Sequence, residues 1–273
     1  ELTLEISSGG ADTISVDQDF TGSARTVVVS GDSADDTVSL QSTTKPQQVN
    51  IFSVEGYMTQ IQEVLGGNLN LEEILSDGGD DGSENTITNQ QAPDQVIVSP
   101  DGTRVYVAAS ESDSLVVYNR DRVTGDLTFV ESLVNLDTDF LSNPISGLDG
   151  ASNVIVSADG RYVYVASEMD QTIAFFVRHE GDNQLTFLSS TVLDNAGNPV
   201  SIPLPSDMAF TPDGSVLLVT SEAGNRVDVF EVSLNGDLTF QASLVDGGQD
   251  SGRSTIDGIA GASSVAISSD GRS

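Results

Sequence analysis

A four-residue turn of the form Ser/Thr-x-Asp-Gly recurs along the chain and constrains the fold more than any other feature. Its aspartates are Asp101, Asp159, Asp213 and Asp270, spaced 54 to 58 residues apart. Between these turns lie short β-branched and aromatic runs, such as Tyr-Val-Tyr-Val-Ala at 162–166, which have the length of strands and are bounded by Gly, Asp and Ser. A period of this size that holds four strands is typical of the blades of a β-propeller.

A second repeated signal marks the last strand of each period. It is a leucine followed two positions later by another large apolar residue, at Leu2/Leu4, Leu69/Leu71, Leu127/Phe129, Leu185/Phe187 and Leu238/Phe240. Because alternate residues of a strand share one face, we expect each pair to pack in the core, against the neighbouring blade. The apolar runs do not alternate with polar residues, which indicates sheets buried on both faces and favours a propeller over an open sandwich.

The predicted fold is therefore all-β, a β-propeller of four-stranded antiparallel blades, with about four blades and a partial blade at each end. The blades are expected at 26–76, 94–136, 151–193 and 206–245, the last strand of a preceding blade with its connector at 1–25, and the first strand of a following blade at 261–273. An insertion at 55–68 has the spacing of an amphipathic helix, and a lengthened hairpin fits it almost as well. We expect one propeller domain, cut from a longer polypeptide.

The charge of the chain narrows its partners. It carries 42 acidic against 10 basic residues, a formal net charge of −32, and it has no cysteine. Such a charge argues against nucleic acid and anionic membranes as partners, and it favours divalent cations, basic partners or a saline medium. Disulfides and thiolate chemistry are excluded, and no apolar run reaches the length that spans a bilayer. We predict no membrane insertion in this segment.

The connections from one blade to the next are longer than closure of the fold requires, and they are acidic. The densest runs from 77 to 85, where Asp77, Asp80, Asp81, Glu84 and Asn85 offer oxygen ligands. Calcium takes six to eight oxygens from flexible loops, although no stretch here matches the EF-hand pattern. Calcium at these five residues is thus a prediction, with a solvated charge-rich loop as the alternative.

Two further groups of acids are candidates for binding a partner on the same face. One group lies in the later connections, at Asp137, Asp139, Asp246 and Asp250. The other follows the second strand of three blades, as Ser-Glu at Glu111, Glu168 and Glu222, although ordinary turn residues would also explain this group.

Catalysis has little support in the sequence. His179 is the single histidine, and the repeat places it at the far end of the blade from the channel mouth, where we expect Asp94, Ser152, Ser206, Asp207 and Ser263. These positions offer no His, Arg or Lys, so a Ser-His-Asp arrangement cannot be assembled there.

Several blocks resemble a known group of repeats. They are GASSVAISSDGR at 261–272, SADGRYVYVAS at 157–167, LLVTSE at 217–222 and GDLTF at 125–129. These blocks are similar to the YVTN-type repeats of microbial surface-layer propellers and of the lactonase-like propeller family, which includes 6-phosphogluconolactonases. That resemblance implies a propeller and, for the lactonases, His, Glu and Arg side chains at the channel mouth, where this chain has small or acidic residues.

We therefore predict a non-enzymatic, microbial cell-surface or extracellular propeller module for assembly, adhesion or protein binding. Its partners would be other protein chains or other domains of the same long polypeptide, with calcium as a candidate ligand. The alternative is a lactonase-like hydrolase that acts at the channel mouth.

Overall fold

The fold is seen in a computed structural model. It describes residues 75–83, 85–179, 184–250, 252–268 and 271 with their side chains, and before them the backbone of seven strands. The chain divides into two compact units, Glu1–Ser132 and Leu133–Ser273. All regular elements of the described residues are β-strands, which confirms the predicted all-β class. It follows that this part of the chain holds no helix suited to crossing a bilayer.

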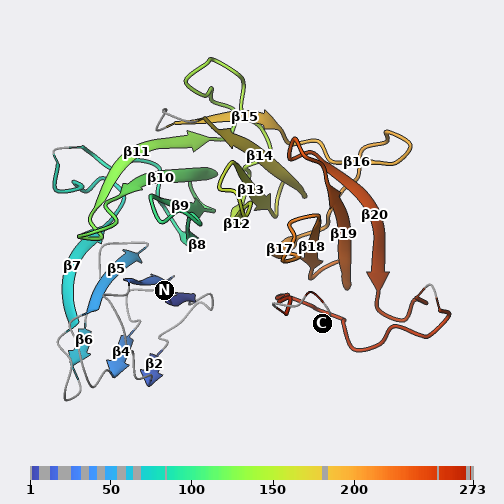
Figure 1. Ribbon diagram of the computed structural model, residues 1–273, viewed down its shortest axis with the longest axis horizontal. Coiled ribbons are helices and arrows are strands. Elements are labelled where there is room, and N and C mark those ends of the chain that lie inside the picture. Colours follow the sequence, from blue (N-terminus) through green and yellow to red (C-terminus); the bar gives the residue numbers. More distant parts are fainter. Residues whose placement is uncertain are drawn as a thin grey trace. The chain divides into compact units, whose positions relative to one another are not determined.

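Three of the sheets contain four antiparallel strands that follow one another in sequence order. The first unit contains β8 (Pro93–Val98), β9 (Arg104–Ala109), β10 (Ser114–Arg120) and β11 (Leu127–Val134), whose last two residues lie past the division. The second unit contains β12 (Ala151–Val156), β13 (Tyr162–Ser167), β14 (Thr172–Arg178) and β15 (Leu185–Ser189). Its other sheet consists of β17 (Pro205–Phe210), β18 (Val216–Ser221), β19 (Arg226–Val232) and β20 (Leu238–Val245), with the short β16 (Leu193–Asp194) added beside β20 (Figure 1). Such sheets are the blades of a propeller.

The repeated turns join the first two strands of each antiparallel sheet. Gly102, Gly160 and Gly214 all have positive φ, and each donates its backbone N–H to the carbonyl of the residue three positions before it, at 2.8 Å. Glycine adopts this backbone region without steric cost, which explains why the motif ends in Gly.

The core lies between neighbouring sheets and on their inner strands. Every residue of β9 and of β13 is buried. In the second unit Tyr164 and Phe175 of one sheet share a cluster with Leu217 and Phe230 of the next. The aromatic residue of each Leu-x-Phe pair packs edge-to-face on a ring of the adjacent strand of its own sheet, such as Phe187 on Phe176 at 5.5 Å. These phenylalanines therefore fill space within their own blade, and Phe240 also packs against the cluster shared by the two sheets of the second unit.

The strands before Leu75 pair differently from the antiparallel blade predicted at 26–76. Here β1 (Leu2–Glu5), β3 (Thr26–Gly31), β5 (Gln47–Ser53) and β7 (Leu69–Leu75) form one parallel sheet, and β2 (Thr13–Asp17), β4 (Thr37–Gln41) and β6 (Gln60–Glu63) form another. Successive strands thus alternate between two sheets instead of pairing with each other. The reason is visible in the sequence, because this stretch lacks the Asp-Gly turn that closes a tight hairpin. Within the insertion, Gln60–Glu63 is a strand and not helical.

Candidate functional site

The acidic connections fold into small hairpins that are held by one aspartate each. Asp81 is 3% exposed and accepts four hydrogen bonds, from the backbone N–H groups of Ser83 and Asn85, from the Asn85 amide, and from the backbone N–H of Phe129 in β11. The last bond, at 2.7 Å, ties the connection to the outer strand of the sheet that follows it. The carboxylate therefore satisfies an edge-strand donor that would otherwise lack a partner.

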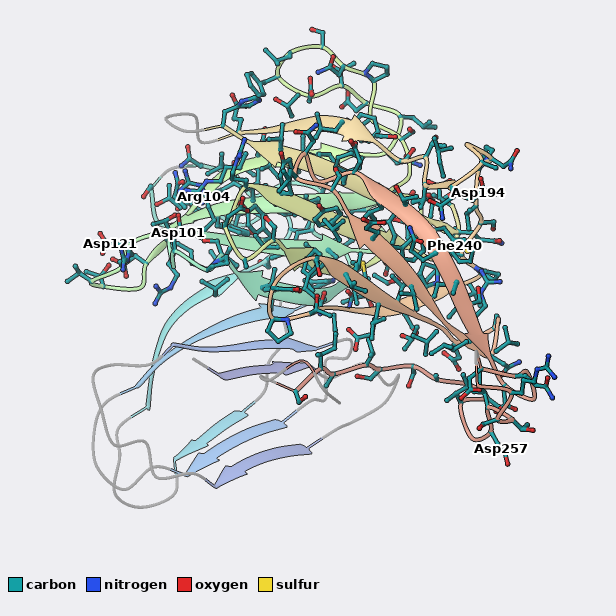
Figure 2. The ribbon with its side chains drawn as sticks, turned by 45° about the vertical axis from the view of Figure 1, so that its right-hand side comes forward. Asp101, Arg104, Asp121, Asp194, Phe240 and Asp257 are labelled. Carbon is teal, nitrogen blue, oxygen red and sulfur yellow. The ribbon has the colours of Figure 1, made fainter. Side chains whose placement is uncertain are left out.

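The next two connections repeat this arrangement. Asp139 is 5% exposed and accepts from Leu141 and Asn143 and from the N–H of Phe187 in β15. Asp194 accepts hydrogen bonds from Ala196 and Asn198. Here the link to the outer strand is not a bond to the carboxylate but a strand pairing, because β16 pairs in parallel with β20 and places Asp194 opposite Phe240 (Figure 2). We call this Asp-x-x-x-Asn hairpin the edge clasp.

The aspartates among the predicted calcium ligands already accept hydrogen bonds in the first edge clasp and beside it. Burial would raise the pKa of Asp81, but its bonds from Asn85, Ser83 and Phe129 outweigh this effect and leave the pKa below its ordinary value. Asp77 accepts from Gln90 and Gln91, and Asp80 accepts from the N–H of Gly82. No group of three or more acidic or histidine side chains that could hold a metal occurs in the described part of the chain, and Glu84 lies outside it. Calcium binding stays a prediction, and the occupied oxygens of Asp81 speak against that residue as a ligand.

The predicted partner-binding acids of the connections also accept hydrogen bonds from backbone N–H groups. Asp137 accepts from the N–H of Thr138, Asp246 from the N–H of Ile259, and Asp250 from the N–H of Ser254. These bonds, together with those of Asp139, order the connections. Whether the acids also meet a partner stays a prediction.

The three glutamates that follow the second strands are not equivalent. Ala109, Ser167 and Ser221 occupy the same last position of β9, β13 and β18, since each pairs with the first residue of the next strand. The next position is Ser110, Glu168 and Glu222, so Glu111 lies one residue further along its turn. Glu168 and Glu222 are thus the equivalent pair, on neighbouring sheets of the second unit.

Glu168 has the most perturbed environment of these acids. Its side chain is half-buried, and burial, followed by the negative charge of Glu222, raises the pKa of Glu168 above its ordinary value. Ser152 acts in the opposite direction, through its hydroxyl group near the carboxylate. A carboxylate with a raised pKa accepts a proton more readily than an ordinary glutamate does.

β-Bulges set the direction of the side chains at the start of β12 and β17. Ala151 pairs with Ser167 and Asn153 pairs with Ala166, which leaves Ser152 as the extra residue, and Ser206 is the extra residue at the same place in β17. The Ser206 hydroxyl bonds to Thr220 at 2.9 Å, whereas Oγ of Ser152 is buried and makes no hydrogen bond within the described residues. Bulges of this kind redirect side chains beside active sites.

A polar bridge joins the two sheets beside Glu168. The Asn153 amide donates to Oδ1 of Asp207 at 3.2 Å, and Oδ2 of Asp207 accepts from the Ser264 hydroxyl and from the N–H of Val265, both at 2.8 Å. Oδ1 of Asn153 and Oγ of Ser167 are buried without partners among the described residues. The candidate site therefore consists of Glu168 and Ser152, with Glu222 and the Asn153–Asp207 bridge at its border.

Comparison with known proteins places the chain in a family. The family model described as "Lactonase, 7-bladed beta-propeller" matches residues 78–140 and 133–252, which together make up more than half of the chain. The chain belongs to this lactonase family.

Individual relatives of this lactonase-family chain are distant. A 6-phosphogluconolactonase of Bacillus subtilis is 25% identical over 154 residues, which cover 56% of this chain and 41% of that protein. Among solved structures, a Lactobacillus plantarum protein matches with 22% identity over 56% of this chain and 41% of its own, at a TM-score of 0.46. A periplasmic gluconolactonase of Pseudomonas aeruginosa matches with 24% identity over 58% and 42%, at a TM-score of 0.42. The chain thus spans about two-fifths of the length of the curated relative that it matches.

Membership in the lactonase family corrects the predicted function. The sequence favoured a non-enzymatic module because His, Arg and Lys are missing at the expected channel mouth. The family and the curated relative are lactonases, and they support the alternative instead. His179 is not at the candidate site, because its ring bonds to Thr186 at the opposite end of β14 and β15. Asp94, the expected channel-mouth residue of the first unit, is the extra residue of the bulge in β8.

Sequence reasoning named Glu168 as a partner-binding residue and missed its environment. Alignment on the Ser-Glu pairs places Glu111 with Glu168, whereas alignment on the Asp-Gly turns places Ser110 there. The second alignment was available from the sequence and would have singled out Glu168 and Glu222.

Proposed function

We propose that this chain forms part of a lactone hydrolase in which Glu168 is the general base. Family membership supports the reaction class, and the observation that carries the assignment is the half-buried, pKa-raised carboxylate of Glu168 beside the Ser152 hydroxyl. In lactone hydrolysis water adds to the carbonyl carbon and the ring C–O bond breaks, which yields a hydroxy acid.

The residues of the site divide these steps. Glu168 accepts a proton from the attacking water, and Ser152, whose buried hydroxyl lies near the carboxylate, positions that carboxylate. When the ring bond breaks, the protonated Glu168 returns its proton to the leaving alkoxide. The Asn153–Asp207 bond at 3.2 Å holds β12 against β17 and so maintains the position of Ser152.

The charges around Glu168 favour a lactone without a phosphate group. Glu222 adds negative charge at Glu168, and the chain as a whole carries −32. Arg226 stands at the same end of its sheet as Glu222, but it bonds to Asp228 at 2.9 Å and to the carbonyl of Ser201. A phosphate would thus meet mainly like charge here.

The test is a lactone-opening assay by pH-stat, corrected for spontaneous hydrolysis. We expect glucono-δ-lactone to be opened, and Glu168→Gln to lower kcat by at least about 100-fold, as loss of a general base does. Glu231→Gln is the matched control, because Glu231 is exposed at the opposite end of the same sheet as Glu222. Hydrolysis no faster than in buffer, or a Glu168→Gln variant as active as the parent chain, would refute the proposal.

The predicted extracellular location and the predicted protein partners are separate from this proposal and stay predictions. Proteolytic mapping on whole cells and pull-down with the purified chain would test them.

A further inference from the structure

A polar cavity of about 370 Å³ lies in the second unit, and its lining does not include Glu168, which stands two residues before the lining residue Asp170. It is bordered by the turn between β13 and β14, through Asp170, Gln171 and Thr172, and by the two connections that flank this sheet, through Ser146, Ser190 and Ser201. Its volume is within the range of small-molecule sites, which is roughly 300–1,000 Å³.

Comparison of two copies of the repeat shows how the cavity is built. Each copy has a pair of hydroxyl groups 44 residues apart, Thr88 with Ser132 at 3.1 Å and Ser146 with Ser190 at 2.9 Å. In the first copy the following residue is Asn89, whose amide donates to Ser132 at 3.0 Å and occupies the place beside the pair. In the second copy that residue is Gly147, and the hydroxyl pair has no amide over it.

Gly147 is also required by the close approach of the chain. Its φ is +84°, and a Cβ there would lie 2.4 Å from Cβ of Ser190 and 3.1 Å from Cγ2 of Thr172. The glycine thus brings the connection onto Ser190 and leaves the hydroxyl pair facing the cavity. The copy with the cavity therefore departs from the repeat at one specific residue.

The polar groups of the cavity offer both donors and acceptors. Oε1 of Gln171 accepts a hydrogen bond from the Ser201 hydroxyl at 3.0 Å. This bond uses the amide oxygen and leaves the two amide hydrogens of Gln171 to donate to a ligand. The bond between Ser146 and Ser190 uses one hydroxyl hydrogen, and the other remains. The lining contains one carboxylate, Asp170, which accepts from the N–H of Asp149, and it contains no Lys, Arg or His.

Apolar surface completes the cavity. Val192, Pro199 and Val200 lie between these hydroxyl and amide groups. A ring that carries several hydroxyl groups around a C–H face would match both kinds of surface. An anion would find no Lys, Arg or His in the lining, and the Arg226 guanidinium, which bonds to the Ser201 carbonyl, is already paired with Asp228. An apolar ligand would leave the polar groups without partners.

We propose that this cavity, between the β13–β14 turn and the two flanking connections, is a binding site for a neutral saccharide. Glu168 is not among the lining residues, and sugar binding does not depend on catalysis by Glu168. Gln171 donates to a sugar hydroxyl, and the pair Ser146 and Ser190 provides an adjacent donor and acceptor.

Ligand-observed saturation-transfer NMR with the whole chain tests this proposal. The probes are D-glucose, D-galactose, D-mannose and N-acetylglucosamine, with glucose 6-phosphate as the charged counterpart. We expect at least one neutral sugar to show transfer that saturates in the millimolar range, and glucose 6-phosphate to bind at least tenfold more weakly than glucose.

Variants distinguish the cavity from other surfaces. Gln171→Ala and Thr191→Val, which remove lining groups, should each weaken binding about tenfold, whereas Gln241→Ala, at an exposed glutamine of β20, should leave it unchanged. Glu168→Gln should also leave it unchanged, which separates this site from the lactone site. The proposal is overturned if none of the four neutral sugars shows transfer at about 50 mM, a concentration at which even a weak site would be occupied. It is also overturned if the Gln171 and Thr191 variants bind as the parent chain does.

Discussion

The edge clasp of Asp139 makes a quantitative prediction about stability. Replacing Asp139 by Ala removes four hydrogen bonds of 2.8 to 2.9 Å, one of which holds the backbone N–H of Phe187 in the outer strand β15. An unsatisfied buried donor costs about 1–3 kcal/mol, and the bonds within the clasp, which water can partly replace, add about 1–2 kcal/mol. We expect a loss of about 3 kcal/mol in the free energy of unfolding.

A matched control in the same unit isolates the cause. Asp250 occupies the equivalent position of a later connection, but it is exposed and accepts from Ser254 alone among the described residues. Asp250→Ala should therefore cost less than about 1 kcal/mol. Asp139→Asn keeps the size of the side chain but turns an NH₂ group toward donors, so it should lose nearly as much as Asp139→Ala.

Urea unfolding followed by circular dichroism at pH 7 measures these differences, provided that the m-value stays constant. In a thermal melt, about 3 kcal/mol corresponds to a fall in Tm of about 6–12 °C for a unit of this size. Equal shifts for Asp139→Ala and Asp250→Ala, or a shift below about 1 °C for the former, would show that the clasp does not hold the edge strand.

Other consequences can be measured on the same chain. Tyr164→Phe removes the buried bond from its hydroxyl to the carbonyl of Gly236, at 2.8 Å, and should cost about 1–2 kcal/mol in chemical unfolding. Glu222→Gln removes the like charge that raises the pKa of Glu168, so the acidic limb of the pH–rate profile should move to lower pH. The pKa of Asp81 is lower in the folded chain than in the unfolded chain, so Asp81 stabilises the fold fully above its unfolded pKa. This stabilisation disappears as the pH falls through the folded pKa, and Tm should therefore decrease when the pH is brought below about 4. If calcium binds in the 77–85 connection as the sequence predicts, exchange of calcium for EDTA should lower Tm, and an unchanged Tm would count against that site.

The blades from Pro93 onward could be predicted from the sequence because their signals are local. The Asp-Gly turns define the first hairpin of each sheet, and the Leu-x-Phe pairs mark its last strand. Before Leu75 these signals are weak or missing, and the prediction failed where it extended the repeat by analogy. Gln47–Ser53, for example, has strand composition in either arrangement, and composition does not decide whether its neighbours run parallel or antiparallel.

The candidate site was harder to predict because it depends on register. A bulge inserts a single residue, and this makes Ser152 point differently from what a regular strand would give. The contact of Asn153 with Asp207 joins residues 54 positions apart on separate sheets. Neither feature leaves a mark in composition or periodicity.

The acidic residues of the chain have two different roles, which the sequence alone does not distinguish. Asp139 accepts bonds from N–H groups, and although burial opposes this effect, its pKa lies below the ordinary value and the residue stays charged as part of the scaffold. Glu168 is withdrawn from water and faces another carboxylate, so its pKa rises and it can exchange a proton. An acidic residue of this fold is thus a functional candidate when backbone donors are missing around it, and not because it belongs to an acid-rich loop. The buried Asp228 shows that this criterion needs a second condition, because burial raises its pKa and yet the side chains of Ser243 and Arg226 bond to it, which gives it a structural role.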